Sequence, residues 1–253
     1  MTSKCLIRCY GMTKYDNQYA MVLDYASGGS LKNYLKSKGS NLKLTNKIRI
    51  LNDVCNALCA IHQKNLPHGD LHSGNIVIKK NVCRITDVGL CGPVSYHDIN
   101  KPRGIIPYLA PELFRRRVTK TKESDIYSVG ILMWEIFAEG EQPFTNRPHD
   151  YKLINDICKL DMRPPLIVGM PSDYKDIMEQ CWSRDPSQRP NVQSLLSFAQ
   201  NKFSQISNRD NGDSGNNNSN NNNSNNNSSS NSDNKYKSRL LNMEINLYEE
   251  GLK

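Results

Sequence analysis

Two short apolar segments, residues 76–78 and 82–86, are separated by only three polar residues. Apolar runs of this length on either side of a short polar link predict a β-hairpin. Asn75 precedes the first strand and Asp87 follows the second, so antiparallel pairing brings them to the same end of the hairpin. An amide oxygen beside a carboxylate suits Mg²⁺, which accepts phosphate oxygens as further ligands. The hairpin therefore predicts a metal site at Asn75 and Asp87.

Asp70 lies five residues before Asn75, on the loop that leaves a long amphipathic helix predicted for residues 45–63. From that loop its carboxylate could accept a proton from a hydroxyl nucleophile. Taken singly, Asp70 could be a loop cap, Asn75 a turn residue and Asp87 a strand-end cap. Their joint spacing favours phosphoryl-transfer chemistry over three separate structural roles.

The hydrophobic pattern of the first 205 residues indicates a mixture of strands and helices. An early pair of strands is expected at residues 6–10 and 19–23, joined by a polar turn at residues 16–17. The stretch 129–137 is apolar on nearly every side, so its helix belongs in the core. Helices are expected at residues 31–35 (with Ser30 as N-cap), 45–63, 124–137, 150–160, 172–182 and 191–203.

Composition changes sharply near residue 205. Residues 211–234 consist almost entirely of Asn and Ser and include no apolar side chain to bury. Nothing offsets the entropy of ordering such a segment, so we expect it to be disordered. Leu241, Ile245 and Tyr248 then recur at helical spacing, which predicts a short helix near the carboxyl terminus.

The formal net charge of +8 is compatible with acidic partners such as nucleotide phosphates or acidic peptides, but a solvated basic surface is the simpler explanation. No basic stripe is interleaved with aromatic residues, so we expect no nucleic-acid partner. The most apolar run, residues 129–138, contains Glu135 and is too short to span a bilayer, so we expect no membrane partner.

The cysteines are scattered, without a Cys-x-x-Cys pair. A zinc site built from Cys5, Cys9, Cys55 and Cys59 is conceivable, but Cys55 and Cys59 also suit the apolar face of a helix. Residues 1–10 lack the apolar stretch of a signal peptide. We therefore expect reduced thiols and an intracellular location, most simply the cytoplasm.

Residues 68–75 read His-Gly-Asp-Leu-His-Ser-Gly-Asn, residues 87–89 read Asp-Val-Gly, and residues 110–112 read Ala-Pro-Glu. In this order they resemble the catalytic loop, the metal-binding triplet and the end of the activation segment of eukaryotic protein kinases, in the tyrosine-kinase-like and tyrosine-kinase neighbourhood. Residues 125–130 are similar to the start of the buried central helix of the kinase carboxyl-terminal lobe. The likeness covers residues 5–203.

This resemblance implies an α+β, protein kinase-like fold with a mainly helical carboxyl-terminal lobe, a two-strand remnant of the amino-terminal lobe and a disordered Asn/Ser-rich tail. It also implies a division of the chain into four parts. These are the remnant and hinge at residues 1–26, the carboxyl-terminal lobe at 27–205, the disordered segment at 206–237 and a short terminal helix within 238–253.

The resemblance further implies the roles of single residues. Asp70 would be the catalytic base, while Asn75 and Asp87 would hold Mg²⁺ on the phosphates of ATP. His72 takes the position of a lysine that contacts the transferring phosphate in serine/threonine kinases. A histidine near its usual pKa is mostly neutral at pH 7, so His72 would be a weaker phosphate partner.

The segment Met-Val-Leu-Asp-Tyr-Ala that ends at Ala26 resembles the kinase hinge. The backbone carbonyl of Asp24 and the backbone N–H of Ala26 would meet adenine. Leu23 would take the gatekeeper position, and Val77 would form the floor of the adenine pocket. Ser30 falls where a ribose contact is expected, although a helix N-cap explains it equally well.

The chain departs from the kinase pattern in several places. It contains no Gly-x-Gly-x-x-Gly sequence and no glutamate before Glu112, so the lysine–glutamate ion pair of kinases cannot form within it. Gly69 replaces the arginine that precedes the catalytic aspartate, which argues against activation by a phosphate on the activation loop. Ile105 stands where serine/threonine kinases often carry threonine, so this position weakens the preference for a serine or threonine substrate.

The resemblance also implies an ion pair. Arg189 would pair with Glu112.

We therefore predict a protein kinase domain that transfers the γ-phosphate of ATP to a hydroxyl of a protein substrate, with serine or threonine favoured over tyrosine. We expect weak or no activity from this chain alone. A truncated gene model would explain the absent segments. A glycine-rich loop and a lysine strand encoded upstream of Met1 would favour the enzyme over the binding module. The alternative is a non-catalytic, kinase-like (pseudokinase) module that binds protein partners. The sequence does not indicate the substrate protein, the pathway or the oligomeric state.

Overall fold

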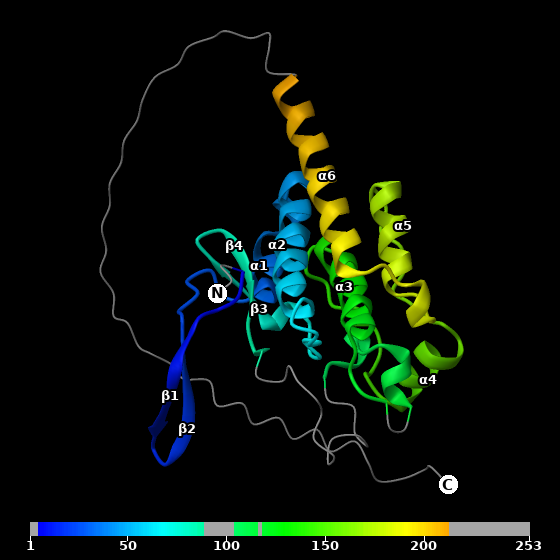
Figure 1. Ribbon diagram of the computed structural model, residues 1–253. Helices are drawn as coiled ribbons and strands as arrows, with labels where there is room; N and C mark the ends of the chain where they lie inside the picture. Colours follow the sequence, from blue (N-terminus) through cyan, green and yellow to red (C-terminus); the bar gives the residue numbers. More distant parts are fainter. Residues whose placement is uncertain (1–4, 89–103, 116–117, 213–253) are drawn as a thin grey trace, which may run out of the picture. The chain divides into compact units, whose positions relative to one another are not determined.

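The computed structural model describes residues 5–88, 104–115 and 118–212 (Figure 1). Six α-helices and two separate two-stranded antiparallel sheets lie within these residues, so the predicted α+β class is confirmed. The strands are β1 (Cys9–Tyr15), β2 (Gln18–Leu23), β3 (Ile76–Lys79) and β4 (Val82–Ile85). The helices are α1 (Leu31–Lys38), α2 (Leu44–His62), α3 (Lys122–Phe137), α4 (Tyr151–Lys159), α5 (Ser172–Cys181) and α6 (Val192–Gly212).

The hairpin of β3 and β4 forms as predicted. Ile76 pairs with Ile85, and Lys79, which we had expected in the turn, belongs to the strand. The turn consists of Lys80 and Asn81, whose φ angles are 51° and 61°. Positive φ at both central residues gives a two-residue turn the twist that antiparallel strands need. The residues just before β3 and just after β4 therefore lie at one end of the hairpin.

The hairpin of β1 and β2 turns at Asp16 and Asn17, as predicted. Its first strand runs from residue 9 to residue 15, so the strand predicted at residues 6–10 is wrong. The pairing register shifts between Cys9 and Gly11, which is a bulge or irregularity that breaks the alternation of apolar and polar residues. That break hid the true limits of the strand.

Residues 5–7 run beside β4 instead. The Ile7 N–H donates to the Ile85 carbonyl at 3.0 Å, and the Ile85 N–H donates to the Cys5 carbonyl at 3.2 Å. The side-chain amide of Asn56, on α2, also contacts the Cys5 sulfur at 3.2 Å. The segment that leads into β1 is thereby attached both to the second hairpin and to α2.

Helix α3 is buried on every side, as predicted. All residues from Ser124 to Phe137 are buried. α3 packs against α5, and α2 packs against α6, pairings that can be followed in Figure 1. None of the helices in the described part of the chain combines the length and hydropathy needed to span a bilayer.

Polar caps fix the starts of three helices. Ser30 caps α1 and Asp150 caps α4, both through side-chain oxygens that accept backbone N–H groups. α3 begins at Lys122, two residues before the predicted start, because Thr121 and Ser124 form a reciprocal capping box. Such a cap contributes about 1 kcal/mol to helix stability.

Helix α6 continues to Gly212, past residue 203, where we had expected it to end. Phe203 and Ile206 both pack against the hydrophobic core, which extends the helix beyond the change in composition at residue 205. Residues 213–253 lie outside the described residues. They include most of the predicted disordered segment and the predicted terminal helix.

The cysteines within the described residues are free thiols. Cys55 and Cys59 are buried on α2, which agrees with their place on the apolar face of the helix. Burial raises the pKa of the Cys55 thiol to about 12. The Cys59 thiol lies 3.0 Å from the side-chain oxygen of Gln193, on α6.

Candidate active site

Asp125 of α3 anchors the loop that carries Asp70. Its buried carboxylate accepts hydrogen bonds from the backbone N–H groups of His68 at 2.7 Å and Gly69 at 2.8 Å. The ring nitrogen Nε2 of His62 lies 2.8 Å from the same carboxylate and donates a third bond. A buried carboxylate is stable only when donors surround it in this way. Sequence reasoning placed Asp125 in the central helix but did not find this role.

His68 connects the loop to the end of β4. Its Nδ1 accepts the Asp70 backbone N–H at 3.2 Å, so in the neutral ring Nε2 carries the proton. Nε2 lies 3.0 Å from the Thr86 carbonyl and donates to it. The residue before Asp87 is thereby fixed relative to Asp70.

The structure brings Asp70 and Asn75 into direct contact. The Asn75 side-chain amide donates to the Asp70 backbone carbonyl at 2.9 Å and lies 3.3 Å from the Asp70 carboxylate. The backbone carbonyl of Asn75 accepts the Thr86 N–H at 2.9 Å. Asp87 is the next residue after Thr86 in the chain. Asp87 has a φ of 58°, a left-handed conformation that is uncommon for a non-glycine residue and concentrates at functional sites.

Gly104 lies against the carboxylate of Asp70. A Cβ atom at this position would come within 3.1 Å of the Asp70 Oδ1 atom and within 2.9 Å of the Leu109 side chain. Gly104 also has a φ of 141°, which L-residues with side chains rarely adopt. The segment that begins at Gly104 therefore covers one side of Asp70, a contact that sequence reasoning missed.

His72 is buried beside Asp70. Its Nδ1 accepts the Gly74 N–H at 3.0 Å, and its Nε2 lies 3.9 Å from the Asp70 carboxylate. Burial lowers the pKa of His72, against the opposing effect of the Asp70 charge. The ring is therefore neutral at pH 7, with its Nε2 proton on the side of Asp70.

Glu135 of α3 links three separate segments from inside the core. It accepts hydrogen bonds from the Ser73 hydroxyl at 2.8 Å, from the Tyr108 hydroxyl and from the Gln142 side-chain amide. Burial raises the pKa of Glu135, while these three hydrogen bonds lower it. Its isolation in an apolar run was the only sequence signal for this role, and sequence reasoning used it only to exclude a membrane span.

The predicted hinge residues lie next to β3. The Ser30 and Val77 backbones form an antiparallel bridge, which brings the two residues together. Leu23, at the end of β2, and Ala26 are half-buried. Within the described residues, neither the Asp24 carbonyl nor the Ala26 N–H has a hydrogen-bond partner.

The Asp24 carboxylate is held by two side chains. The Lys79 ammonium lies 2.6 Å from it, and the Tyr10 hydroxyl donates to it at 2.8 Å. The hydrogen bond from Lys79, followed by that from Tyr10, lowers the pKa of Asp24. These contacts join the first hairpin to β3 of the second hairpin.

Comparison with known proteins identifies the family. A family model described as protein tyrosine and serine/threonine kinase matches residues 1–198. The chain belongs to the protein kinase family. The predicted kinase-like fold is therefore confirmed, and protein kinases use ATP and Mg²⁺ to phosphorylate proteins.

Three similar kinases come from Dictyostelium discoideum. RGS domain-containing serine/threonine-protein kinase A is 27% identical over 205 residues, which cover 80% of this chain and 18% of that protein. Probable serine/threonine-protein kinase gdt2 is 32% identical over 189 residues, covering 71% and 11%. Probable serine/threonine-protein kinase gdt4 is 28% identical over 213 residues, covering 81% and 13%. The chain thus spans less than a fifth of the length of these relatives.

Glu112, the last residue of the Ala-Pro-Glu motif of this kinase, forms the predicted ion pair with Arg189. Two nitrogens of the buried Arg189 guanidinium donate to the two Glu112 carboxylate oxygens at 2.7 and 2.8 Å. Arg189 also donates to the carbonyls of Ser183 at 2.9 Å and Glu123 at 3.0 Å. The bidentate pair ties the end of the kinase activation segment to the segment before α6, and the bond to Glu123 adds the first turn of α3.

Gly69 stands where most kinases carry arginine. It has a φ of +80°, and a Cβ there would lie 2.7 Å from the Lys120 side chain. The space beside the catalytic loop is therefore filled by Lys120 in this kinase. Gly89, the last residue of the Asp-Val-Gly triplet, and the activation-loop residues up to 103 lie outside the described residues.

Proposed function

We propose that this chain carries the base and the metal-binding residues of a kinase that transfers the γ-phosphate of ATP to a serine or threonine hydroxyl of a protein. The observation that carries the proposal is the hydrogen-bonded pair of Asp70 and Asn75, together with the backbone bond from Asn75 to Thr86, the residue that precedes Asp87. The names of the three relatives, all serine/threonine kinases, support the choice of hydroxyl.

Asp70 would accept the proton of the substrate hydroxyl as it attacks. The Asn75 amide nitrogen is turned toward Asp70, which leaves its oxygen available to a cation. That oxygen and the Asp87 carboxylate are the hard donors that Mg²⁺ prefers, so these residues fit the ion. When bound, Mg²⁺ would neutralise the charge that develops on the ATP phosphates.

The adenine ring would lie against the hinge. Nothing in the described part of the chain binds the Asp24 carbonyl or the Ala26 N–H, so they offer it one acceptor and one donor, between Leu23 and Val77. The Ser30 hydroxyl accepts the Asn33 N–H at 3.3 Å and can still donate its own proton to a ribose oxygen.

We further propose that this chain alone transfers phosphate weakly or not at all. Its residues include no Gly-x-Gly-x-x-Gly loop and no glutamate before Glu112, the parts that position the phosphates in kinases. A pseudokinase module that binds protein partners is the second candidate. It is favoured by His72, a neutral ring in the place of a phosphate-binding lysine. The intracellular location remains a prediction.

Transfer of labelled γ-phosphate to a mixed protein substrate tests this proposal, with Asp87→Ala as the site variant. The exposed Asp176→Ala, on α5, is the matched control. We expect transfer close to background, with any excess lost in Asp87→Ala and kept in Asp176→Ala. Strong transfer that survives Asp87→Ala would contradict the assigned site. Strong transfer lost only in Asp87→Ala would support the site and contradict the weak activity.

A further inference from the structure

Strand β2 has an open edge. In the part of the chain that the structure describes, β2 pairs with β1 alone, in the blue hairpin of Figure 1. The backbone groups on the side away from β1 form the outer edge of β2. Backbone N–H and carbonyl groups at such an edge bind water or a further strand, so an exposed edge is a template for pairing with another chain.

The turn decides which backbone groups lie on this outer edge. Tyr15 and Gln18 flank the two-residue turn of the hairpin, so they form a hydrogen-bonded pair. Hydrogen-bonded and non-hydrogen-bonded pairs alternate along an antiparallel ladder. Tyr19 and Met21 therefore turn their N–H and carbonyl groups away from β1. Within the described residues, no other group bonds to them.

The side chains beside the outer edge are apolar. Tyr19 and Met21 lie on one face of the hairpin, and their exposed fractions are 79% and 52%. β2 itself contains no charged residue, no proline and no glycine. A strand added at this edge would therefore gain packing between side chains as well as backbone hydrogen bonds.

The edge of β1 is protected by comparison. The pairing register shifts next to Gly11, which has a φ of 150°. Lys14, opposite Tyr19, turns its backbone groups to the outer side of β1. Irregular register and lysine side chains are two of the features that prevent edge strands from pairing. Association through the hairpin should therefore use β2.

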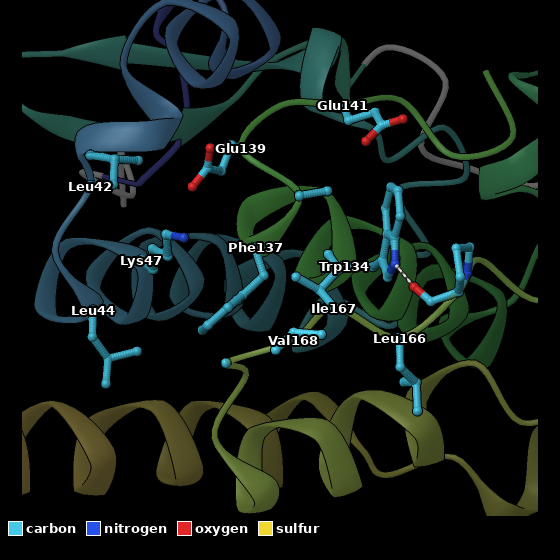
Figure 2. Close-up of a pocket in the computed structure, with 13 residues that line it drawn as sticks. Leu42, Leu44, Lys47, Trp134, Phe137, Glu139, Glu141, Leu166, Ile167 and Val168 are labelled. Atoms are coloured by element: carbon cyan, nitrogen blue, oxygen red, sulfur yellow. Dashed lines mark hydrogen bonds between the residues drawn. The ribbon is translucent and has the colours of Figure 1, made fainter. Parts of the chain in front are cut away.

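Another exposed apolar surface is less suited to covering by a second chain. The cleft drawn in Figure 2 is lined by Phe137 and Ile167, but also by Lys47, Glu139 and Glu141. Burying these charged groups against another chain would cost desolvation free energy. The outer edge of β2 has no such charge to bury.

We propose that two copies of this chain pair antiparallel through the outer edges of β2, about a twofold axis at Ala20. Tyr19 of each copy would then lie opposite Met21 of the second copy and exchange both backbone hydrogen bonds with it. The contact is self-complementary, as a twofold interface requires. Each tyrosine ring would also meet a methionine sulfur, which is a favourable contact. This pairing does not depend on the kinase chemistry proposed above.

The axis at Ala20 keeps the pairing within β2. Moving it to Met21, the next position that brings outward groups together, would draw Asp24 of each copy into the interface. Asp24 is already bound by Lys79 and Tyr10. The paired edge is short and buries less surface than the interface of a stable dimer, so the copies should exchange readily.

Cysteine cross-linking tests the register. Residues at the axis face their own copies, at about 4.5 Å between Cα atoms, a separation that a disulfide can span. Ala20→Cys should therefore form a linked dimer on oxidation with copper-phenanthroline, seen on a non-reducing gel. Thr13→Cys, opposite Ala20 on β1, is the matched control and should give only the wild-type background.

Sedimentation velocity over a range of concentrations tests whether the assembly is closed. We expect the mass to level off at two copies. Met21→Lys should weaken dimerisation at least about tenfold, because it places a charge in the interface. Leu160→Lys, at an exposed position outside the hairpin, should leave it unchanged. Thermal unfolding, measured first, establishes that each variant is folded.

Amide hydrogen exchange, measured residue by residue by NMR, distinguishes a second copy from a segment of the same chain. Protection of the Tyr19 and Met21 N–H groups should rise with protein concentration. Protection that is the same at all concentrations would overturn the proposal, because the edge would then be open or covered by its own chain. Equal cross-linking of Ala20→Cys and Thr13→Cys would also overturn it, as would growth past two copies without a plateau.

Discussion

The side-chain nitrogen of Asn75 contacts Asp70 twice, at 2.9 Å from its backbone carbonyl oxygen and at 3.3 Å from its carboxylate. This contact sets the orientation of both side chains. The nitrogen of Asn75 faces the candidate base, so its oxygen is the atom left for a cation. One side chain therefore holds the candidate base in place and serves as a candidate metal ligand.

Replacing Asn75 should cost stability as well as metal binding. Asn75→Ala removes both contacts with Asp70, and we expect a loss of about 1–2 kcal/mol in the free energy of unfolding. Urea denaturation measures this loss. The exposed Asn33→Ala, on α1, is the control and should change the stability by less than about 0.5 kcal/mol. Equal effects of the two substitutions would contradict the structural role of the Asn75 amide.

The ion pair of Glu112 and Arg189 should be worth far more than an exposed pair. Arg189 is buried, so Glu112→Ala leaves an uncompensated charge and should cost about 3–5 kcal/mol. Lys202 pairs with the exposed Asp173 and serves for comparison, and Lys202→Met should cost at most about 1 kcal/mol. Chemical denaturation of both variants checks this difference. Similar losses would show that burial does not set the strength of the Glu112 pair.

Glu135 should make stability depend on pH. Its folded-state pKa is raised above the ordinary 4.5, so the folded chain holds this proton more tightly than the unfolded chain. The contribution of Glu135 to stability should therefore fall as pH rises from about 4.5 through the raised pKa. The Glu135→Gln variant has no titratable group at this position, so its stability lacks this pH dependence.

The stability of wild type minus that of Glu135→Gln, measured by urea denaturation at several pH values, isolates the effect. We expect this difference to decrease with rising pH across that window. A difference that is constant or increases would contradict the buried environment assigned to Glu135.

The hairpin of β1 and β2 should limit solubility. Met12 and Tyr19 are 71% and 79% exposed on it, and exposed apolar strands promote association. Met12→Lys with Tyr19→Lys should raise the concentration at which the chain begins to associate, as measured by light scattering. Leu160→Lys, a change at a residue that is 69% exposed elsewhere, should have little effect. An equal gain from Leu160→Lys would show that the hairpin is not the cause.

Local patterns in the sequence were enough to predict most elements. The β3–β4 hairpin followed from apolar runs around a polar turn, and the start of α1 followed from Ser30. The limits of β1 did not follow, because the register shift near Gly11 interrupts its alternation. The extension of α6 depends on contacts of Phe203 and Ile206 with the core, which composition does not reveal.

The interactions that hold the site together were the hardest to foresee. Asp125 binds a residue 57 positions earlier in the chain, and Glu135 binds one 62 positions earlier. Such contacts arise only when the helix and the loop are packed together, so no local pattern encodes them. The only sign of these contacts in the sequence was a charged residue inside an apolar helix.

Binding of a non-hydrolysable ATP analogue, with and without Mg²⁺, tests the central claim most directly. The claim is that Asn75 and Asp87 form the metal site of a kinase. Calorimetry should show Mg²⁺-dependent binding that Asp87→Ala weakens at least about tenfold and that Asp176→Ala leaves unchanged. Binding that persists equally without Mg²⁺, or that Asp87→Ala does not weaken, would contradict it.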